Sequence, residues 1–440
     1  MPLISSDEKN PRFTGVSTSS MCMFGMVALA LMVFCVPARQ AMAQKPTGEL
    51  MLPRPNDLRI DETSMLVDPE PRGFGLLGCT MRIIDPDEAG NPRRLLAGRA
   101  FKVLEFTEGT DGDWTVTNVI DAPEDCGNPG NFGTKFDVDG DYLGVLPMDR
   151  SGKGGVHVYR RKADGWERTQ LLLHSNLPEG TRYHGRIVME DGLMCIYDRE
   201  GVTIYRRTPT GVYTLDALLV AENEADRDRF GRSVAIEGDL IAVTLFRAKA
   251  VSEEVRFFKK GEKPGEWIHQ STIKPTDGIP GSWFGEHMAL EKDELVVASP
   301  KWDIAVGKVD IFRPDADGNW KHAQELKVKP DSLSSFGTTL HLGESHLVVG
   351  ASMPKIPGSA YVFEKGPEGG YTRVCMLGRP EADINDGFAM QVNIIDETIL
   401  VSSPFERVGE TGRAGVLRFY ALDKDEDPAG ESEKSQASEG

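Results

Sequence analysis

A unit of about fifty residues recurs along this chain. Each copy is marked by an aromatic residue followed by a small one, and consecutive copies lie 47 to 58 residues apart. Internal repeats of this period are typical of solenoids, propellers and repeat arrays. The seven markers are Phe74-Gly75, Phe132-Gly133, Tyr183-His184, Phe230-Gly231, Phe284-Gly285, Phe336-Gly337 and Phe388-Ala389.

Each copy contains four short apolar runs that have the composition of β-strands. In the fourth copy, Phe230 to Thr244 holds two runs around a Glu-Gly-Asp turn, and Val255 to Lys260 and Trp267 to Lys274 are the others. Runs of four to eight residues rich in Val, Ile, Phe and Tyr and bounded by Gly, Asp and Pro predict strands. Seven copies give about 28 strands, too many for one open sheet. We therefore predict an all-β fold, a seven-bladed β-propeller of four-stranded antiparallel blades.

The ends of the repeat predict how the ring closes. The seventh copy has three runs, ending near Leu422, and its fourth is missing. Ser64 to Val67 lies before the first marker at about the same spacing as Leu218 to Val220 lies before Phe230. We expect this N-terminal strand to complete the last blade, which protects a sheet edge. The predicted propeller spans residues 60–422.

The segments outside the ring predict export. Met21 to Val36 is an uncharged run too short for a typical membrane span, and Ala41-Met42-Ala43 follows it as a small-x-small cleavage pattern. We predict a signal peptide over residues 1–43, a linker over 44–59 and an acidic disordered tail over 423–440. The protein would then be secreted, periplasmic or on the cell surface. An uncleaved anchor is the alternative, and only then is a membrane partner expected.

Charge and cysteines narrow the classes of function. The formal charge is −18, from 50 basic and 68 acidic side chains, which argues against binding to nucleic acid. None of the four cysteines beyond the signal lies in a CxxC or CxxH pair, so we expect no zinc site. One disulfide is compatible with the sequence, and Cys79–Cys126 is the nearest pair. Buried thiols are the alternative, particularly for Cys195 and Cys375.

The repeats resemble FG-GAP repeats, the unit of the integrin α-subunit propeller. The aromatic-glycine markers carry the resemblance, together with second runs that end in Val297 to Pro300, Val349 to Ser352 and Val401 to Pro404. The resemblance implies the propeller fold and suggests protein binding or cell adhesion. Calcium-binding copies of that family have a DxDxDGxxD-type loop between the first two strands. Here Asp137 to Asp141 and Asp315 to Asn319 come nearest, and we interpret both as tight turns. No metal or other cofactor is predicted, although calcium is the alternative.

Two sets of side chains are candidates for a site. No HExxH, GxSxG or complete phosphate-loop motif is present, so we assign no catalytic residue. Polar residues three and five positions after the markers fall on first strands, which line the axis of a propeller. They could form a polar pocket, hydrogen-bond between blades or be solvated. They are Lys135, Asp137, Arg186, His287, His341, Gln391 and Asn393.

The second set lies in the links between second and third strands, which we expect to be longer than the others. Loops on a rigid scaffold commonly carry function, and exposed Trp and Arg often anchor interfaces. We predict a non-catalytic, exported binding or adhesion propeller that engages a protein or glycan through these links. The alternatives are a hydrolase with a site at the axial mouth and a purely structural surface component. The candidate ligand-binding residues are Arg150, Lys153, Arg247, Trp302, Lys355, Phe405, Arg407 and Arg413.

The fourth runs each begin with an aromatic residue. A recurring aromatic at one place in every repeat is more typical of packing between blades than of a ligand cage. We therefore expect these six side chains to pack against neighbouring blades. They are Trp114, Trp166, Tyr213, Trp267, Trp320 and Tyr371.

Overall fold

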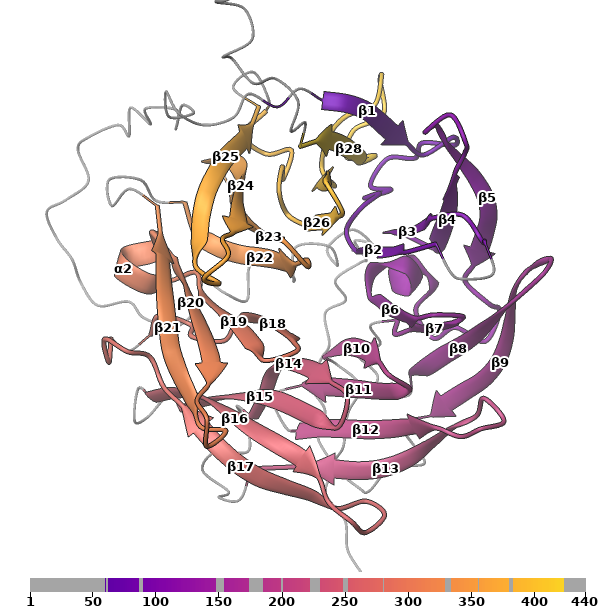
Figure 1. Cartoon of the computed structure of the whole chain (residues 1–440). Coiled ribbons are helices and arrows are strands. Elements are labelled where there is room, and N and C mark those ends of the chain that lie inside the picture. Colours follow the sequence, from indigo (N-terminus) through magenta and orange to yellow (C-terminus); the bar gives the residue numbers. More distant parts are fainter. Residues whose placement is uncertain are drawn as a thin grey trace, which may run out of the picture. The chain divides into compact units, whose positions relative to one another are not determined.

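The predicted propeller is confirmed. A computed structural model describes residues 60, 62–86, 90–147, 154–173, 185–198, 201–221, 230–247, 252–279, 281–328, 334–354, 356–379 and 383–422. The predicted signal, linker and acidic tail lie outside these residues. Within them the chain forms seven four-stranded antiparallel sheets, arranged as the blades of a ring (Figure 1). None of the described helices has the length and apolar character needed to cross a bilayer.

The blades follow one another along the chain. Blade 1 contains β2 (Met81–Ile84), β3 (Arg94–Arg99), β4 (Lys102–Glu108) and β5 (Trp114–Asp121). Blade 2 follows the short helix η1 (Pro129–Thr134) and contains β6 (Phe136–Asp139), β7 (Tyr142–Val145), β8 (Gly155–Lys162) and β9 (Gly165–Leu173). Blade 3 contains β10 (Arg186–Glu190), β11 (Leu193–Asp198), β12 (Gly201–Arg207) and β13 (Tyr213–Leu219). Blade 4 contains β14 (Phe230–Glu237), β15 (Leu240–Arg247), β16 (Ser252–Lys260) and β17 (Trp267–Ile273).

The remaining three blades complete the ring. Blade 5 contains β18 (His287–Glu291), β19 (Glu294–Ser299), the short helix α2 (Trp302–Ala305), β20 (Lys308–Pro314) and β21 (Trp320–Lys327). Blade 6 contains β22 (Phe336–Leu342), β23 (His346–Met353), β24 (Ile356–Lys365) and β25 (Tyr371–Gly378). Blade 7 contains β26 (Val392–Ile395), β27 (Thr398–Ser403), β28 (Val416–Ala421) and β1 (Glu62–Val67).

The N-terminal strand closes the ring as predicted. β1 pairs antiparallel with β28, and the register places Leu66 opposite Leu417 and Val67 opposite Val416. Beside this ladder, Arg418 lies 2.9 Å from a carboxylate oxygen of Glu62, and the hydroxyl of Thr63 donates to the carbonyl of Phe419. The first and last described segments of the chain therefore share one sheet (Figure 1).

The hydrophobic core lies between blades. Seven buried clusters occur among the described residues, and each draws its members from two neighbouring sheets, including blades 7 and 1. Second strands such as β3 and β19 are buried along their whole length, because neighbouring blades cover both of their faces. The outer strand β5 instead alternates between more and less exposed positions, the pattern of a strand with one solvated face.

Among the described residues the recurring marker packs where a blade begins, but the first copy was misplaced. The marker Tyr183-His184 of blade 3 lies outside the described residues. Phe284 is buried, and Gly285 has a positive φ of 82° at a place where a Cβ would lie 2.1 Å from a methyl carbon of Thr244. In blade 1 the equivalent residues are Leu77 and Gly78, which share the backbone conformation and hydrogen bonds of Phe284 and Gly285. Phe74 lies three residues earlier and is 47% exposed. The buried position of blade 1 holds leucine, and the aromatic-glycine pattern in the sequence therefore fell on the nearby Phe74-Gly75 instead.

Link lengths follow the prediction in part. Three links between second and third strands are long: 146–154, 300–307 and 404–415. Two others, expected over 245–254 and 352–359, are shortened to 248–251 and 354–355 because their flanking strands extend further than their apolar runs. Blade 1 has its long link, 85–93, between the first and second strands. We call the face that carries links between second and third strands the loop face, and the opposite face the turn face.

The fourth-strand aromatics join blades. Trp114 stacks on Phe419 of blade 7, with ring centroids 5.3 Å apart, and Trp320 stacks on Phe257 of blade 4 at 4.5 Å. Tyr213 meets a tyrosine of blade 2 edge-on. The others donate hydrogen bonds to carboxylates of the preceding blade, which are Glu105 for Trp166, Asp216 for Trp267 and Glu294 for Tyr371. The expected packing role is confirmed.

Candidate functional site

The structure describes four of the eight candidate residues fully. Arg150, Lys153 and Lys355 lie outside the described residues. Arg247 ends β15, and its side chain is outside the described part of the molecule. The remaining four fall into two groups on the loop face. Trp302 lies in the link of blade 5, and Phe405, Arg407 and Arg413 lie in the link of blade 7.

The blade 7 link is fixed from beneath by one carboxylate. Glu406 accepts hydrogen bonds from both terminal nitrogens of Arg418, each at 2.7 Å, and from Arg379 at 2.8 Å. At its tip, Val408 and Thr411 exchange backbone hydrogen bonds of 3.0 Å. Bidentate arginine–carboxylate pairs fix orientation as well as adding energy. The link is therefore held in one conformation by ion pairs with the blade below it.

This link presents cations beside aromatic rings. The guanidinium carbon of Arg413 lies 5.2 Å from the ring centre of Phe74 and 6.0 Å from that of Phe405. Arg407 is exposed and donates to the carbonyl of Glu410 at 3.0 Å. We call Phe74, Phe405, Arg407 and Arg413 the blade 7 patch. Phe74, the aromatic residue of the first sequence marker, belongs to this patch.

Trp302 is held by a second charged cluster. Its indole nitrogen donates to Asp277 at 2.7 Å, and the ammonium of Lys327 lies 4.2 Å from its ring centre. The short helix that it begins has left-handed backbone angles at Asp303 and Ile304, with φ of 46° and 54°. The Ile304 side chain is 85% exposed. A β-branched residue in this backbone region is strained, so the link stores strain where it meets solvent.

A buried lysine anchors this cluster. Lys308 has no exposed surface, and its ammonium lies 2.8 Å from Asp277, 3.2 Å from Asp310 and 3.3 Å from Glu325. Burial disfavours its charge, but the hydrogen bond to Asp277 and the charge of Asp310 outweigh this and raise the pKa of Lys308. The ammonium therefore stays charged and holds the blade 4–5 link against β20.

Polar residues on the first strands are used between blades. One carboxylate oxygen of Asp137 accepts from the backbone N–H of Met189, at 2.9 Å, in the next blade. Nδ1 of His341 accepts from the backbone N–H of Ile394 in the same relation, at 3.2 Å. Burial, with a smaller contribution from Arg82, lowers the pKa of His341 to about 4, so the ring is neutral and able to accept. For Asp137 and His341 the structure therefore shows hydrogen bonding between blades.

The axis carries basic groups near the loop face. First strands begin there, because His287 and Arg186 pair with residues near the C-terminal ends of the second strands β19 and β11. Arg186 lies 3.9 Å from Glu286, and Arg232 forms an ion pair with the same carboxylate. Lys135 donates to the carbonyl of Gly185. We call Lys135, Arg186 and Arg232 the axial basic group.

The pKa values of neighbouring groups show that these positive charges act on one another. Burial and the charge of Arg186 lower the pKa of Lys135 to about 8. Burial, Arg186 and Arg232 together lower the pKa of His287 well below its usual value. The neutral His287 therefore adds no charge to the axial basic group at neutral pH.

The turn-face end of the same strands is acidic. The last residue of the first strand is Asp139, Glu190, Glu237 and Glu291 in blades 2 to 5. Burial, followed by repulsion from Glu237, raises the pKa of Glu190 to about 8. The first strands therefore carry basic side chains near the loop face and carboxyl side chains at the turn face, where Glu190 is largely protonated at neutral pH.

In the two calcium-like segments, aspartate side chains accept hydrogen bonds from backbone N–H groups. Asp139 accepts from the backbone N–H of Gly192 at 2.8 Å, so it links two blades, as Asp137 does. Asp315 accepts from the backbone N–H groups of Asp317 and Asn319, at 3.0 and 2.9 Å, and closes its own turn. No group of three or more metal-ligating side chains occurs within the described ranges.

The four described cysteines form no disulfide. Cys126, Cys195 and Cys375 are buried, and Cys79 is partly exposed. Burial raises the pKa of Cys79 to about 12, so it is a poor nucleophile at neutral pH. Between the two possibilities left by the sequence, the structure favours thiols.

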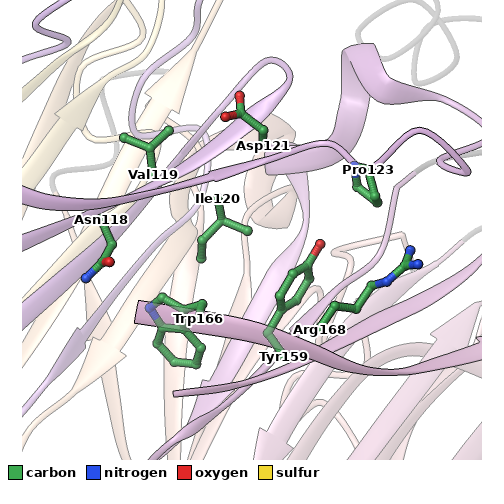
Figure 2. A pocket seen from close by; sticks show the side chains of 8 residues that line it. All are labelled: Asn118, Val119, Ile120, Asp121, Pro123, Tyr159, Trp166 and Arg168. Atoms are coloured by element: carbon green, nitrogen blue, oxygen red, sulfur yellow. The ribbon is translucent and has the colours of Figure 1, made fainter. Parts of the chain in front are cut away.

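A shallow groove lies between blades 1 and 2. It has a volume of about 420 Å³ and was not anticipated from the sequence. Figure 2 shows Ile120 pointing toward Trp166 and Tyr159, whereas Val119 and Asp121 point to the other side of β5. Three of its polar side chains already have partners: Trp166 and Asn118 donate to Glu105, and Arg168 donates to Asp125. The groove is therefore a weaker candidate than the loop face.

Comparisons with known proteins give the repeat and the fold. A family model described as FG-GAP repeat matches residues 213–252. A solved protein from Lactobacillus plantarum is 13% identical with a TM-score of 0.50, over 69% of this chain and 84% of its own. Two proteins titled "putative 6-phosphogluconolactonase", from Bacteroides uniformis and Bacteroides fragilis, are 13% and 14% identical. Their TM-scores are 0.49 and 0.46, over 73% and 76% of this chain and 88% and 89% of theirs. No curated protein matches the chain significantly.

Proposed function

Because the seven-bladed ring and the matched repeat fit an FG-GAP β-propeller family, we propose that this protein is an exported, non-catalytic binding propeller. It engages a protein or glycan partner through its loop face. Fold alone does not specify function, so the proposal depends on the chemistry of that face.

The blade 7 patch is the observation that carries the proposal. Its link is fixed by the ion pairs of Glu406 with Arg418 and Arg379, yet Arg407, Arg413 and Phe74 remain exposed. Preorganised side chains lose little entropy on binding, and arginine beside aromatic rings is favoured at interface hot spots. Two exposed guanidinium groups on a chain of charge −18 favour a partner with anionic groups.

The test is capture of a partner followed by point substitution. The native extracellular fraction would be passed over the immobilised protein, and the retained partner would be measured for affinity by surface plasmon resonance. The variant R407E/R413E should weaken binding at least about a hundredfold, because two attractive charges become repulsive. Thermal denaturation controls for folding, since both side chains are exposed.

A matched control lies on the turn face. Lys292 is exposed in the turn between β18 and β19, so K292E changes surface charge without touching the patch. Equal loss of affinity in K292E and R407E/R413E would show a general charge effect. Unchanged affinity in R407E/R413E would refute the assignment of the loop face.

A further inference from the structure

We propose that the axial basic group binds a compact oxyanion, which is a phosphate, sulfate or carboxylate group carried by a ligand. This site lies at the loop-face end of the axis and is separate from the blade 7 patch. It does not require the proposed partner, so either assignment can fail while the other stands.

The three cations converge from three consecutive blades. Arg186 of blade 3 reaches past blade 4 to Glu286 of blade 5, at 3.9 Å, and Arg232 of blade 4 pairs with the same carboxylate. Lys135 of blade 2 donates to Gly185, the residue immediately before Arg186. One small anion near Glu286 can therefore be reached by the arginines of blades 3 and 4 at once.

The charges of the four side chains named here do not balance, although Arg232 also interacts with Glu253. Lys135, Arg186 and Arg232 contribute three positive charges and Glu286 one negative charge, so the sum is 3 − 1 = +2. The lowered pKa of Lys135 reflects the resulting repulsion in part. An oxyanion relieves this repulsion.

The two arginines are both accessible and oriented. The Arg186 side chain is 43% exposed and that of Arg232 is 24% exposed, so a ligand can approach from the loop face. The guanidinium of Arg232 lies 4.3 Å from the ring centre of Trp283, which fixes its plane. A planar guanidinium matches the spacing of two oxygens of a phosphate, sulfate or carboxylate. The site thus has the geometry for bidentate recognition.

The experiment measures binding of inorganic phosphate, sulfate and acetate to the full chain by calorimetry, at constant ionic strength. We expect at least one of these anions to bind, and R186Q and R232Q each to weaken it about tenfold or more, because a charge-assisted hydrogen bond is lost. The preferred anion identifies which group the natural ligand carries.

Two further variants keep the result independent of folding. E286Q removes the competing carboxylate and should tighten binding at least about threefold, a gain that misfolding cannot produce. R407Q alters only the blade 7 patch, so it should leave anion binding unchanged even if it weakens the protein or glycan partner. No heat with any of the three anions, equal binding by R186Q and wild type, or weaker binding by E286Q would overturn the proposal.

Discussion

Replacement of Glu105 by glutamine tests whether buried carboxylates hold the blades together. The side chain of Glu105, on β4, is fully buried. It accepts from Trp166 at 2.9 Å and from Arg161 at 3.0 Å, both in blade 2. It also accepts from Asn118 at 2.7 Å and Arg94 at 3.4 Å within blade 1. One carboxylate thus serves four donors across a blade boundary.

The magnitude follows from the burial. Glutamine has nearly the same shape, but it removes the negative charge opposite the buried guanidinium of Arg94, and its NH₂ group would face other donors. Loss of one partner from a buried ion pair costs about 3–5 kcal/mol. For a cooperative unit of about 360 residues, the entropy of unfolding converts this cost into a fall in Tm of about 4–7 °C.

Thermal denaturation followed by circular dichroism measures this fall. E108Q is the matched control, because Glu108 lies on the same strand and pairs with Arg93 at 3.4 Å but is 29% exposed. An ion pair at the surface contributes about 0–1 kcal/mol, so E108Q should change Tm by about 1 °C or less. If E105Q lowers Tm no more than E108Q does, the reasoning about buried inter-blade carboxylates is wrong.

One deletion and substitutions at two sites test the closure of the ring, a histidine and the buried lysine. Deletion of Ile60–Asp68 removes β1 and should lower Tm in one cooperative transition; an unchanged Tm would contradict closure by this strand. The pKa of His341 is lowered to about 4, so the unfolded chain takes up a proton below about pH 6.5 that the folded ring does not. Its stabilisation is therefore complete above about pH 6.5 and falls by up to about 3 kcal/mol toward pH 4 in urea titrations. H341N keeps an acceptor for Ile394 and should flatten this dependence, and identical pH profiles would refute it. K308M strands the buried carboxylate of Asp310 and should cost about 3–5 kcal/mol, whereas K308M/D310N should recover much of this; equal losses would show that the pair is not coupled.

The fold could be predicted because its signal is repeated. Each blade must bury the same marker and the same four runs, so seven weak patterns reinforce one another, and the missing last strand could be placed by counting. The error at Phe74 arose where one blade fills the marker position with Leu77, since apolar burial does not require an aromatic ring. Link lengths were less predictable because β23 and β24 extend past their apolar runs.

The candidate site was less predictable because it combines residues distant in sequence. Phe74 meets Arg413 only because β1 joins the last blade, and Arg232 meets Glu286 only because blades 4 and 5 are neighbours in the ring. The offset pattern on first strands identified Lys135 and Arg186 but missed Arg232, which lies two positions after its marker instead of three. A pattern that allows a basic residue two or three positions after the marker includes Arg232.

The position of β1 also sets the order in which the protein can form. Thr63 and Phe419 are 356 residues apart and yet hydrogen-bond in the closing sheet. On the ribosome, β1 emerges early but has no partner until β28 has been synthesised. Contacts over such separations are entropically costly and form slowly. The nascent chain therefore has an unpaired strand edge at each end of the incomplete ring until β28 has been synthesised. Both edges would need protection from pairing with other chains during that time.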